Sequence, residues 1–230
     1  MRISDLVLHN DHQLVVLHKP AGMPVQEDPS GDASLHRIAQ AYCKRDLHLI
    51  NRLDRPCSGL VVMAKTAQSA AHLSSQWQSR TVTKKYLAII PPGVSPATGI
   101  LRHLITREDR KSTASDPSDS TEANAELSYK ICCELDSLTV IEVTTHTGLF
   151  HQIRAQLSAI GFPIRGDVKY GARRANKDRT IGLHCLETCL VHPGSQQLMT
   201  FQCPLPEHDI WPAVADACRA QGYATTSQTP

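Results

Sequence analysis

The chain has 230 residues, of which 41% are hydrophobic and 20% are charged, and its formal net charge is +2. This composition excludes a disordered chain, and the length allows a large folded domain with a buried core. No apolar run reaches the roughly 18 residues that a membrane helix needs, and the first residues, Met-Arg-Ile-Ser-Asp-Leu, lack the apolar stretch of a signal peptide, so we expect a cytoplasmic protein.

The first ninety residues predict strands alternating with helices. Alternation of apolar and polar residues predicts strands, apolar residues at helical spacing predict helices, and Ser34 and Thr66 are suitable N-caps for the two helices. The predicted elements are a strand over 12–18, a helix over 34–44, a strand over 60–64, a helix over 67–80 and a strand over 83–90.

The rest of the chain predicts mainly strands. Residues 106–122 are rich in Ser, Asp and Thr and predict a hairpin loop or a mobile arm, and residues 220–230 are expected to be a disordered end. Because strands outnumber helices and often follow one another, the class is α+β with a largely antiparallel sheet in a single domain over 1–230, its core at about 12–204. The predicted elements are strands over 125–132, 138–144, 182–191 and 197–202, a helix over 150–159 and a short helix from about 212.

The eight cysteines do not indicate a metal site or a disulfide scaffold. The sequence contains no Cys-x-x-Cys, and the nearest zinc candidate is the group His184, Cys185, Cys189 and His192. On a strand, His184 and Cys185 point to opposite faces, so one ion could hardly collect all four side chains. We therefore expect reduced thiols and no bound metal.

The most informative segment is residues 49–65, where Asp54 lies between Arg52 and Arg55 in a turn before an apolar run. Cationic neighbours would hold such a carboxylate ionised. On its own, however, Arg-x-Asp-Arg is more often an exposed ion pair than a catalytic site.

The longer string Arg-Leu-Asp-Arg-Pro-x-Ser-Gly-Leu-Val-Val-x-Ala-Lys resembles the catalytic-aspartate motif of the RluA-type pseudouridine synthases. Further segments resemble the same family in the same order: an opening strand and Lys-Pro-x-Gly turn, a Lys-x-Tyr-x-Ala strand, a helix containing His-Gln-Ile-Arg before Gly-Asp-x-x-Tyr-Gly, and a closing Leu-His to His-Pro strand. These segments are residues 14–25, 84–89, 147–171 and 183–193.

The resemblance implies the pseudouridine synthase fold, a curved, mostly antiparallel mixed sheet with flanking helices and a central cleft. It also implies isomerisation of a specific uridine in structured RNA, either tRNA or large-subunit ribosomal RNA, without a metal or organic cofactor. Because Lys19-Pro20 comes early in the chain, we expect a catalytic domain without an N-terminal accessory RNA-binding domain. We further expect a monomer that needs no protein partner.

Three catalytic residues are implied by the resemblance. Asp54 would act as the nucleophile or as the base that starts glycosidic cleavage. Arg154 would pair with Asp54 in a forked, two-bond contact, and Tyr86 would stack on the uracil and help to remove the carbon-5 proton. Without the resemblance, an exposed helical arginine and a core tyrosine would be the simpler interpretations.

RNA contacts are expected around these residues. Arg52 and Arg55 would wedge the target base out of its stack or hold flanking phosphates. Residues 165–179 carry six basic and two acidic side chains, which indicates either a solvated loop or a phosphate clamp. The other candidate substrate-binding residues are Asn51, Lys85, His151, Gln152, Arg165, Lys169, Arg173 and Arg174.

The sequence departs from the family pattern at two positions. Asn51 occupies a position where His is usual, although Asn also suits a phosphate or backbone contact. Leu149 occupies the place of an arginine. Two alternative functions therefore remain open: a catalytically idle RNA-binding or RNA-folding factor, and a metal-dependent nucleic-acid hydrolase, which the scattered histidines support poorly.

Overall fold

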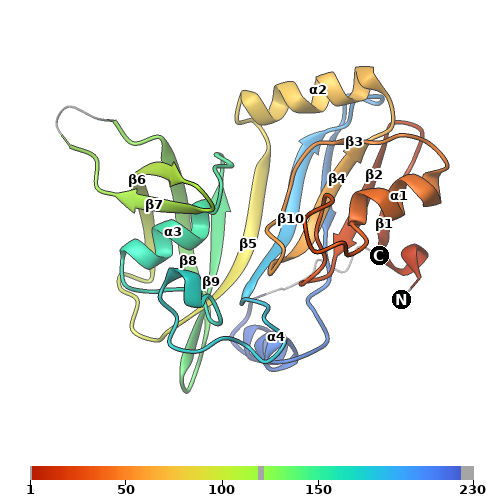
Figure 1. Ribbon diagram of the computed structural model, residues 1–230. Coiled ribbons are helices and arrows are strands. Elements are labelled where there is room, and N and C mark those ends of the chain that lie inside the picture. Colours follow the sequence, from red (N-terminus) through yellow and green to blue (C-terminus); the bar gives the residue numbers. More distant parts are fainter. Residues whose placement is uncertain (1, 119–121, 224–230) are drawn as a thin grey trace. The chain divides into compact units, whose positions relative to one another are not determined.

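The structure is a computed structural model that describes residues 2–118 and 122–223. Contacts divide these residues into two compact units (Figure 1). The first unit contains residues 2–84 and 185–206, and the second contains residues 85–118, 122–184 and 207–223. The prediction of a single domain over 1–230 stays a prediction.

The first unit contains a sheet with strand order β1-β2-β4-β10, in which β3 also pairs with β4 and β11 with β10. The β1–β2, β2–β4, β3–β4 and β10–β11 pairs are antiparallel. The elements are η1 (Ile3–Leu6), β1 (Val7–Asn10), β2 (Leu14–Lys19), α1 (Leu35–Cys43), β3 (His48–Leu49), β4 (Ser58–Ala64), α2 (Ala67–Gln78), β10 (Leu183–Val191) and β11 (Leu198–Gln202), with most of β10 in this unit.

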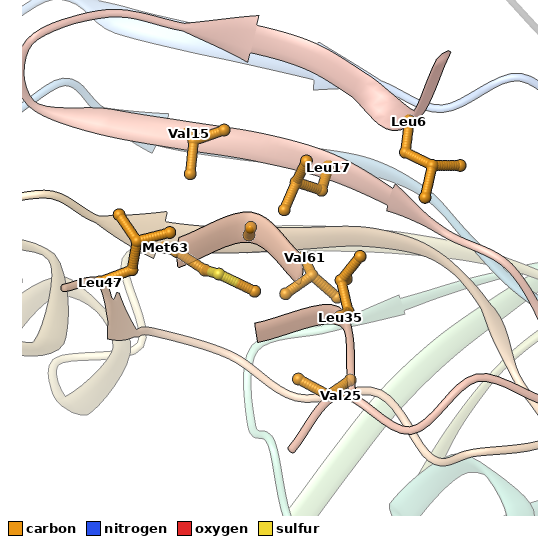
Figure 2. Packing of buried hydrophobic residues seen from close by; sticks show 9 residues of the cluster. Leu6, Val15, Leu17, Val25, Leu35, Leu47, Val61 and Met63 are labelled. Atoms are coloured by element: carbon orange, nitrogen blue, oxygen red, sulfur yellow. The ribbon is translucent and has the colours of Figure 1, made fainter. Parts of the chain in front are cut away.

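One face of this sheet is covered by α1. Side chains of alternate residues on β2 and β4 meet the buried face of α1 in one apolar cluster (Figure 2). Ser34 starts α1 by accepting the backbone N–H of Arg37 through its side chain, and Thr66 caps α2 in the same way with Ser69. The cluster consists of Leu6, Val15, Leu17, Val25, Leu35, Ala39, Leu47, Val61 and Met63.

Gly59 explains the glycine of the Asp54 motif. Its φ is +121°, and a Cβ atom built on it would lie 2.4 Å from the backbone nitrogen and oxygen of Cys185 in β10. Any side chain at this position would push β10 away from β4, because the backbones approach too closely for a Cβ. The motif therefore encodes strand packing as well as the turn before β4.

The second unit has strand order β5-β9-β8-β6-β7, and its β8–β9, β6–β8 and β6–β7 pairs are antiparallel. Helix α3 packs against β7 and β6 (Figure 1), and contacts also join α4 to β8. The elements are β5 (Thr83–Ile90), β6 (Thr98–Glu108), β7 (Lys111–Ser115), β8 (Ala125–Leu135), β9 (Leu138–Thr145), α3 (Gln152–Ala159), η2 (Val168–Tyr170) and α4 (Trp211–Ala220), with most of β5 in this unit.

The fold class is confirmed: the protein is α+β, and its sheet is mostly antiparallel and not closed. The polar stretch 106–122 is largely a hairpin, because β6 extends to Glu108 and β7 begins at Lys111; residues 119–121 lie outside the described residues. The expectation of a disordered end over 220–230 is wrong for residues 220–223, because the Tyr223 hydroxyl donates a hydrogen bond to Glu142. Residues 224–230 lie outside the described residues.

All eight cysteines are free thiols, and none belongs to a group that could share a metal ion among the described residues. Within residues 2–118 and 122–223, the group of side chains close enough to share a metal ion is His9, Asp11 and His192 of the first unit. Both histidines place Nε2 2.8 Å from Asp11 Oδ2. The backbone N–H of Ser195 donates to His192 Nδ1 (3.0 Å), so the His192 ring proton lies on Nε2 and is donated to Asp11. These hydrogen bonds join the three side chains in one network.

Asp11 is the centre of that network. Burial by itself would raise its pKa, but hydrogen bonds from His9, from the backbone N–H groups of Leu14 and Gln13, and from His192 hold the pKa of Asp11 well below its usual range. The carboxylate therefore links the turn before β2 to the end of β10.

No helix in the described part of the chain is both long and apolar enough to cross a bilayer.

Candidate active site

In the first unit, Asp54 lies in the loop between β3 and β4 and is partly exposed. The Cys57 N–H donates to the Asp54 carbonyl at 3.0 Å, which closes a turn just before β4. The preceding side chain, Leu53, packs against the apolar cluster under α1. A partly buried leucine followed by a turn therefore places Asp54 at the rim of this unit's core.

Arg55 does not simply flank Asp54. Its guanidinium contacts Asp28 (Nη1 to Oδ2, 3.0 Å), Ser30 (Nη1 to Oγ, 2.7 Å) and Asp32. The hydrogen bonds that Arg55 donates, first to Asp32 and then to Asp28, raise its pKa. Because two carboxylates compensate its charge, Arg55 anchors the 28–32 loop beside the Asp54 turn.

Arg52 and Asn51 differ in how they are held. Arg52 is exposed, and its Nη1 lies 3.3 Å from Gln26 Oε1, so its guanidinium stays accessible to solvent. The Asn51 amide accepts the Val62 N–H at 2.7 Å and donates to the Leu60 carbonyl at 3.2 Å. Asn51 thus makes a backbone contact, one of its two expected roles, and it joins the loop after β3 to β4.

Lys19, the lysine of the Lys-Pro-x-Gly turn, is a structural residue of this site. Its side chain is fully buried, and Nζ donates to the carbonyls of Pro20 (2.9 Å), Met23 (2.9 Å) and Arg55 (3.1 Å). The Gly22 N–H also donates to the Arg55 carbonyl at 2.8 Å. The Lys-Pro-x-Gly turn therefore holds the peptide that follows Asp54.

Burial lowers the pKa of Lys19 to about 8 from its ordinary 10.5, against opposing contributions from Cys57 and Asp54. Between these two pH values the unfolded chain binds more protons at this position than the folded protein, so the stability of the wild type should rise with pH there. Relative to Lys19→Met, we expect a gain of about 3 kcal/mol in the free energy of unfolding from pH 8 to 10.5. Urea denaturation across this range measures it, and parallel curves for the two proteins would contradict it.

In the second unit, Arg154 lies on α3 and is 5% exposed. Its Nε and Nη2 donate to Oδ2 and Oδ1 of Asp167 at 2.7 and 2.9 Å, and the Asp167 side chain is 2% exposed. The ring of Tyr170 covers the guanidinium at 4.8 Å. Arg154, the predicted active-site arginine, therefore makes a forked contact with a carboxylate. Within this unit that carboxylate belongs to Asp167, which the sequence does not predict as its partner.

His151 and Gln152 are committed to the turn before α3. His151 has a left-handed backbone (φ +55°), and its Nδ1 lies 2.8 Å from the Tyr170 hydroxyl. The buried Gln152 amide accepts from Thr147 Oγ1 (2.8 Å) and from the Leu149 N–H (3.2 Å). The Leu149 side chain is 38% exposed. Both predicted substrate-binding residues thus hold the loop on which Leu149 is presented.

Tyr86 and Lys85 lie on β5 and are partly exposed. The residues that follow them on the strand, from Leu87 to Ile90, are fully buried. Tyr86 is therefore a partly exposed residue of β5 next to the buried end of the strand, and its contact with a substrate stays a prediction.

The basic segment 165–179 borders an open groove of about 1390 Å³ in the second unit. Arg173, Arg174 and Lys177 line it and are exposed. Arg165 also lines it but pairs with Asp209 (Nη2 to Oδ1, 3.2 Å). Lys169 bonds the Arg110 carbonyl, outside the groove lining. Of the predicted clamp, three cations are thus presented to solvent along one concave surface.

Known proteins match this chain over most of its length. The sequence pattern described as RNA pseudouridylate synthase matches residues 13–159. An uncharacterized RNA pseudouridine synthase of Bacillus subtilis is 31% identical over 211 residues, covering 87% of this chain and 69% of that protein. A protein named ribosomal large subunit pseudouridine synthase D, from Nitrosomonas europaea, is 29% identical, covering 96% of this chain and 67% of that protein.

A solved structure of human RNA pseudouridylate synthase domain containing 4 superposes with a TM-score of 0.73 at 25% identity and covers 94% of each chain. Both the Asp54 turn and the Arg154 helix lie inside the matched segment 13–159. The chain belongs to the RNA pseudouridylate synthase family, as its resemblance to the RluA-type enzymes predicts.

Proposed function

We propose that the protein is an RNA pseudouridine synthase that isomerises a specific uridine in structured RNA. The observation that carries this is the complete Asp54 turn, anchored by Lys19 and leading into β4, within the segment that matches the family. The reaction needs no oxidant and adds no atoms, so we expect it to need neither metal nor organic cofactor.

The isomerisation breaks the bond between N1 of uracil and C1′ of ribose and forms a bond between C5 and C1′. The C5 proton is lost, and N1 gains a proton. We assign Asp54 to the cleavage step, as nucleophile or as base. We assign Tyr86 to stacking on the uracil and to removal of the C5 proton, and Arg154 to orienting the Asp54 carboxylate.

The target uridine must leave its helix to be rearranged, which costs a few kcal/mol of unstacking. We assign this step and the flanking phosphates to the solvent-accessible Arg52, and contacts nearby to Lys85. Arg55, whose charge Asp28 and Asp32 compensate, supports them by anchoring the 28–32 loop. Asn51, His151 and Gln152 support substrate binding through the turns that they hold. We assign contacts with the RNA backbone to Arg165, Lys169, Arg173 and Arg174.

The RNA target is tRNA or large-subunit ribosomal RNA. Relatives named for the ribosomal large subunit support ribosomal RNA. The string Arg-Leu-Asp-Arg-Pro, which resembles the branch of the family that modifies tRNA, favours tRNA. Mapping pseudouridines in total RNA from a strain that lacks the gene and from its parent tests both. We expect the loss of one or a few sites that return with the wild-type gene but not with Asp54→Asn; unchanged maps would contradict the proposed function.

A second candidate is a catalytically idle RNA-binding or RNA-folding factor. Leu149 favours it, because this half-exposed leucine stands where the family pattern has an arginine. A gene that carries Asp54→Asn separates the synthase from the idle factor. Full rescue of growth and of ribosome profiles by this gene, in the strain that lacks the wild-type gene, would support the idle factor. We also propose that the protein acts in the cytoplasm as a monomer without an obligate protein partner.

The groove cations provide a separate prediction. Replacing Arg173, Arg174 and Lys177 with Ala should weaken RNA affinity and flatten the slope of log affinity against log salt by up to about 2. The reason is that binding then makes fewer phosphate contacts and therefore releases fewer counterions. Filter binding across a salt series measures the slope. Ala at the exposed Arg2, Arg37 and Arg45 of the first unit is the matched control, and equal slopes for both triple variants would identify 165–179 as a solvated loop.

A further inference from the structure

The forked contact between Arg154 and Asp167 fixes how the arginine can act. It occupies the Nε–Nη2 edge of the guanidinium, and the Tyr170 ring covers its plane. Any further contact of Arg154 must therefore go through its Nη1 side. A guanidinium held on one edge and one face by buried groups presents its other edge in a fixed direction.

Asp167 is itself held rigidly. Its carbonyl accepts the N–H groups of Tyr170 (3.0 Å) and Ala172 (3.1 Å), and its own N–H donates to the Ile164 carbonyl (3.0 Å). The preceding residue, Gly166, has φ +84°, and a Cβ there would lie 2.7 Å from the Thr180 carbonyl oxygen. The backbone around Asp167 thus has one tight conformation that only glycine permits at its start.

The same turn connects to the β6–β7 hairpin. The Tyr170 hydroxyl accepts the Ser112 N–H of β7 at 2.9 Å, and its own proton is then available to His151 Nδ1 at 2.8 Å. Ser158 Oγ of α3 donates to the Tyr170 carbonyl at 2.6 Å. Helix α3, the turn and the hairpin are therefore linked through one tyrosine, whose ring lies on Arg154.

We propose that Asp167 is a positioning residue of the reaction: it sets the direction in which Arg154 presents its Nη1 side, and Tyr170 keeps the guanidinium in that plane. This role rests on the proposed function. Because Arg154 and Asp167 together are close to neutral, Arg154 contributes oriented hydrogen-bond donors rather than an uncompensated charge.

The test uses Asp167→Asn, which removes the charge and one acceptor, and Asp167→Glu, which keeps the charge and displaces the carboxylate by one methylene. RNA from the deletion strain, labelled with tritium at C5 of uridine, releases tritium to water on isomerisation. With enzyme in excess, the maximal rate and the enzyme concentration at half-maximal rate are measured separately, and thermal unfolding gives the folded fraction. Asp216→Asn, at an exposed ion pair of α4, is the matched control.

We expect the maximal rate per folded molecule to fall on the order of 10²-fold for Asp167→Asn, since misplacement of a catalytic group costs this much. Asp167→Glu should lose at least about tenfold, so the proposal stays testable if Asp167→Asn does not fold. Half-maximal concentrations should stay close to the wild-type value. Variants that lose stability but keep the wild-type rate per folded molecule would overturn the proposal. An inactive wild type would instead remove the proposed function and this role with it.

Discussion

Replacing Asp54 with Asn should abolish isomerisation while leaving RNA affinity and thermal stability nearly unchanged. The amide keeps the shape of the carboxylate but can act neither as nucleophile nor as base, and losses of such groups cost 10²-fold or more. Because Asp54 is partly exposed in a loop whose backbone is held by Lys19 and by the Gly22 N–H, we expect the loss of its charge to change stability little.

Tritium release under single-turnover conditions measures the chemistry, and filter binding measures the affinity. The exposed Asp46, which contacts Gln40 at 3.2 Å, provides a matched Asp→Asn control in the same unit. A rate for Asp54→Asn above about one hundredth of the wild-type rate would show that Asp54 is not the catalytic carboxylate.

Arg154→Lys should lose nearly as much activity as Arg154→Ala. A lysine keeps the positive charge but not the planar edge that binds both oxygens of Asp167, so the donors on the other side are no longer directed. Arg154→Ala should also cost about 3–5 kcal/mol of stability, because it leaves the buried Asp167 carboxylate without its partner. Thermal and urea unfolding report this loss.

A double-mutant cycle of Asp54→Asn and Arg154→Ala in single-turnover kinetics tests whether the two residues act as one unit. We expect the double variant to lose little more than Asp54→Asn alone. Ala at the exposed Arg219 is the control for loss of an arginine from a helix. Strictly additive losses would separate Arg154 from the chemistry of Asp54, and the assignment of Arg154 would then have to change.

Local signals were enough for several elements. Ser34 and Thr66 cap α1 and α2 as predicted, and β5 has the predicted bounds, because capping and alternation depend on residues within a few positions of each other. Strand β6 was missed, since the apolar pairs Ile100-Leu101 and Leu104-Ile105 interrupt its alternation. Short β1 and β3 gave too few residues for a pattern.

The candidate catalytic residues came from the sequence by itself, because the order of residues around Asp54, Tyr86 and Arg154 is a motif along the chain. Their supporting contacts came only from the tertiary structure. Lys19 reaches the Arg55 carbonyl 36 residues away, and Arg154 meets Asp167 across a turn and a helix end. Neither contact has a period or a fixed spacing, so nothing local predicts it. Such partners are chosen by burial, since a charged group removed from water must find hydrogen-bond partners wherever the folded chain supplies them.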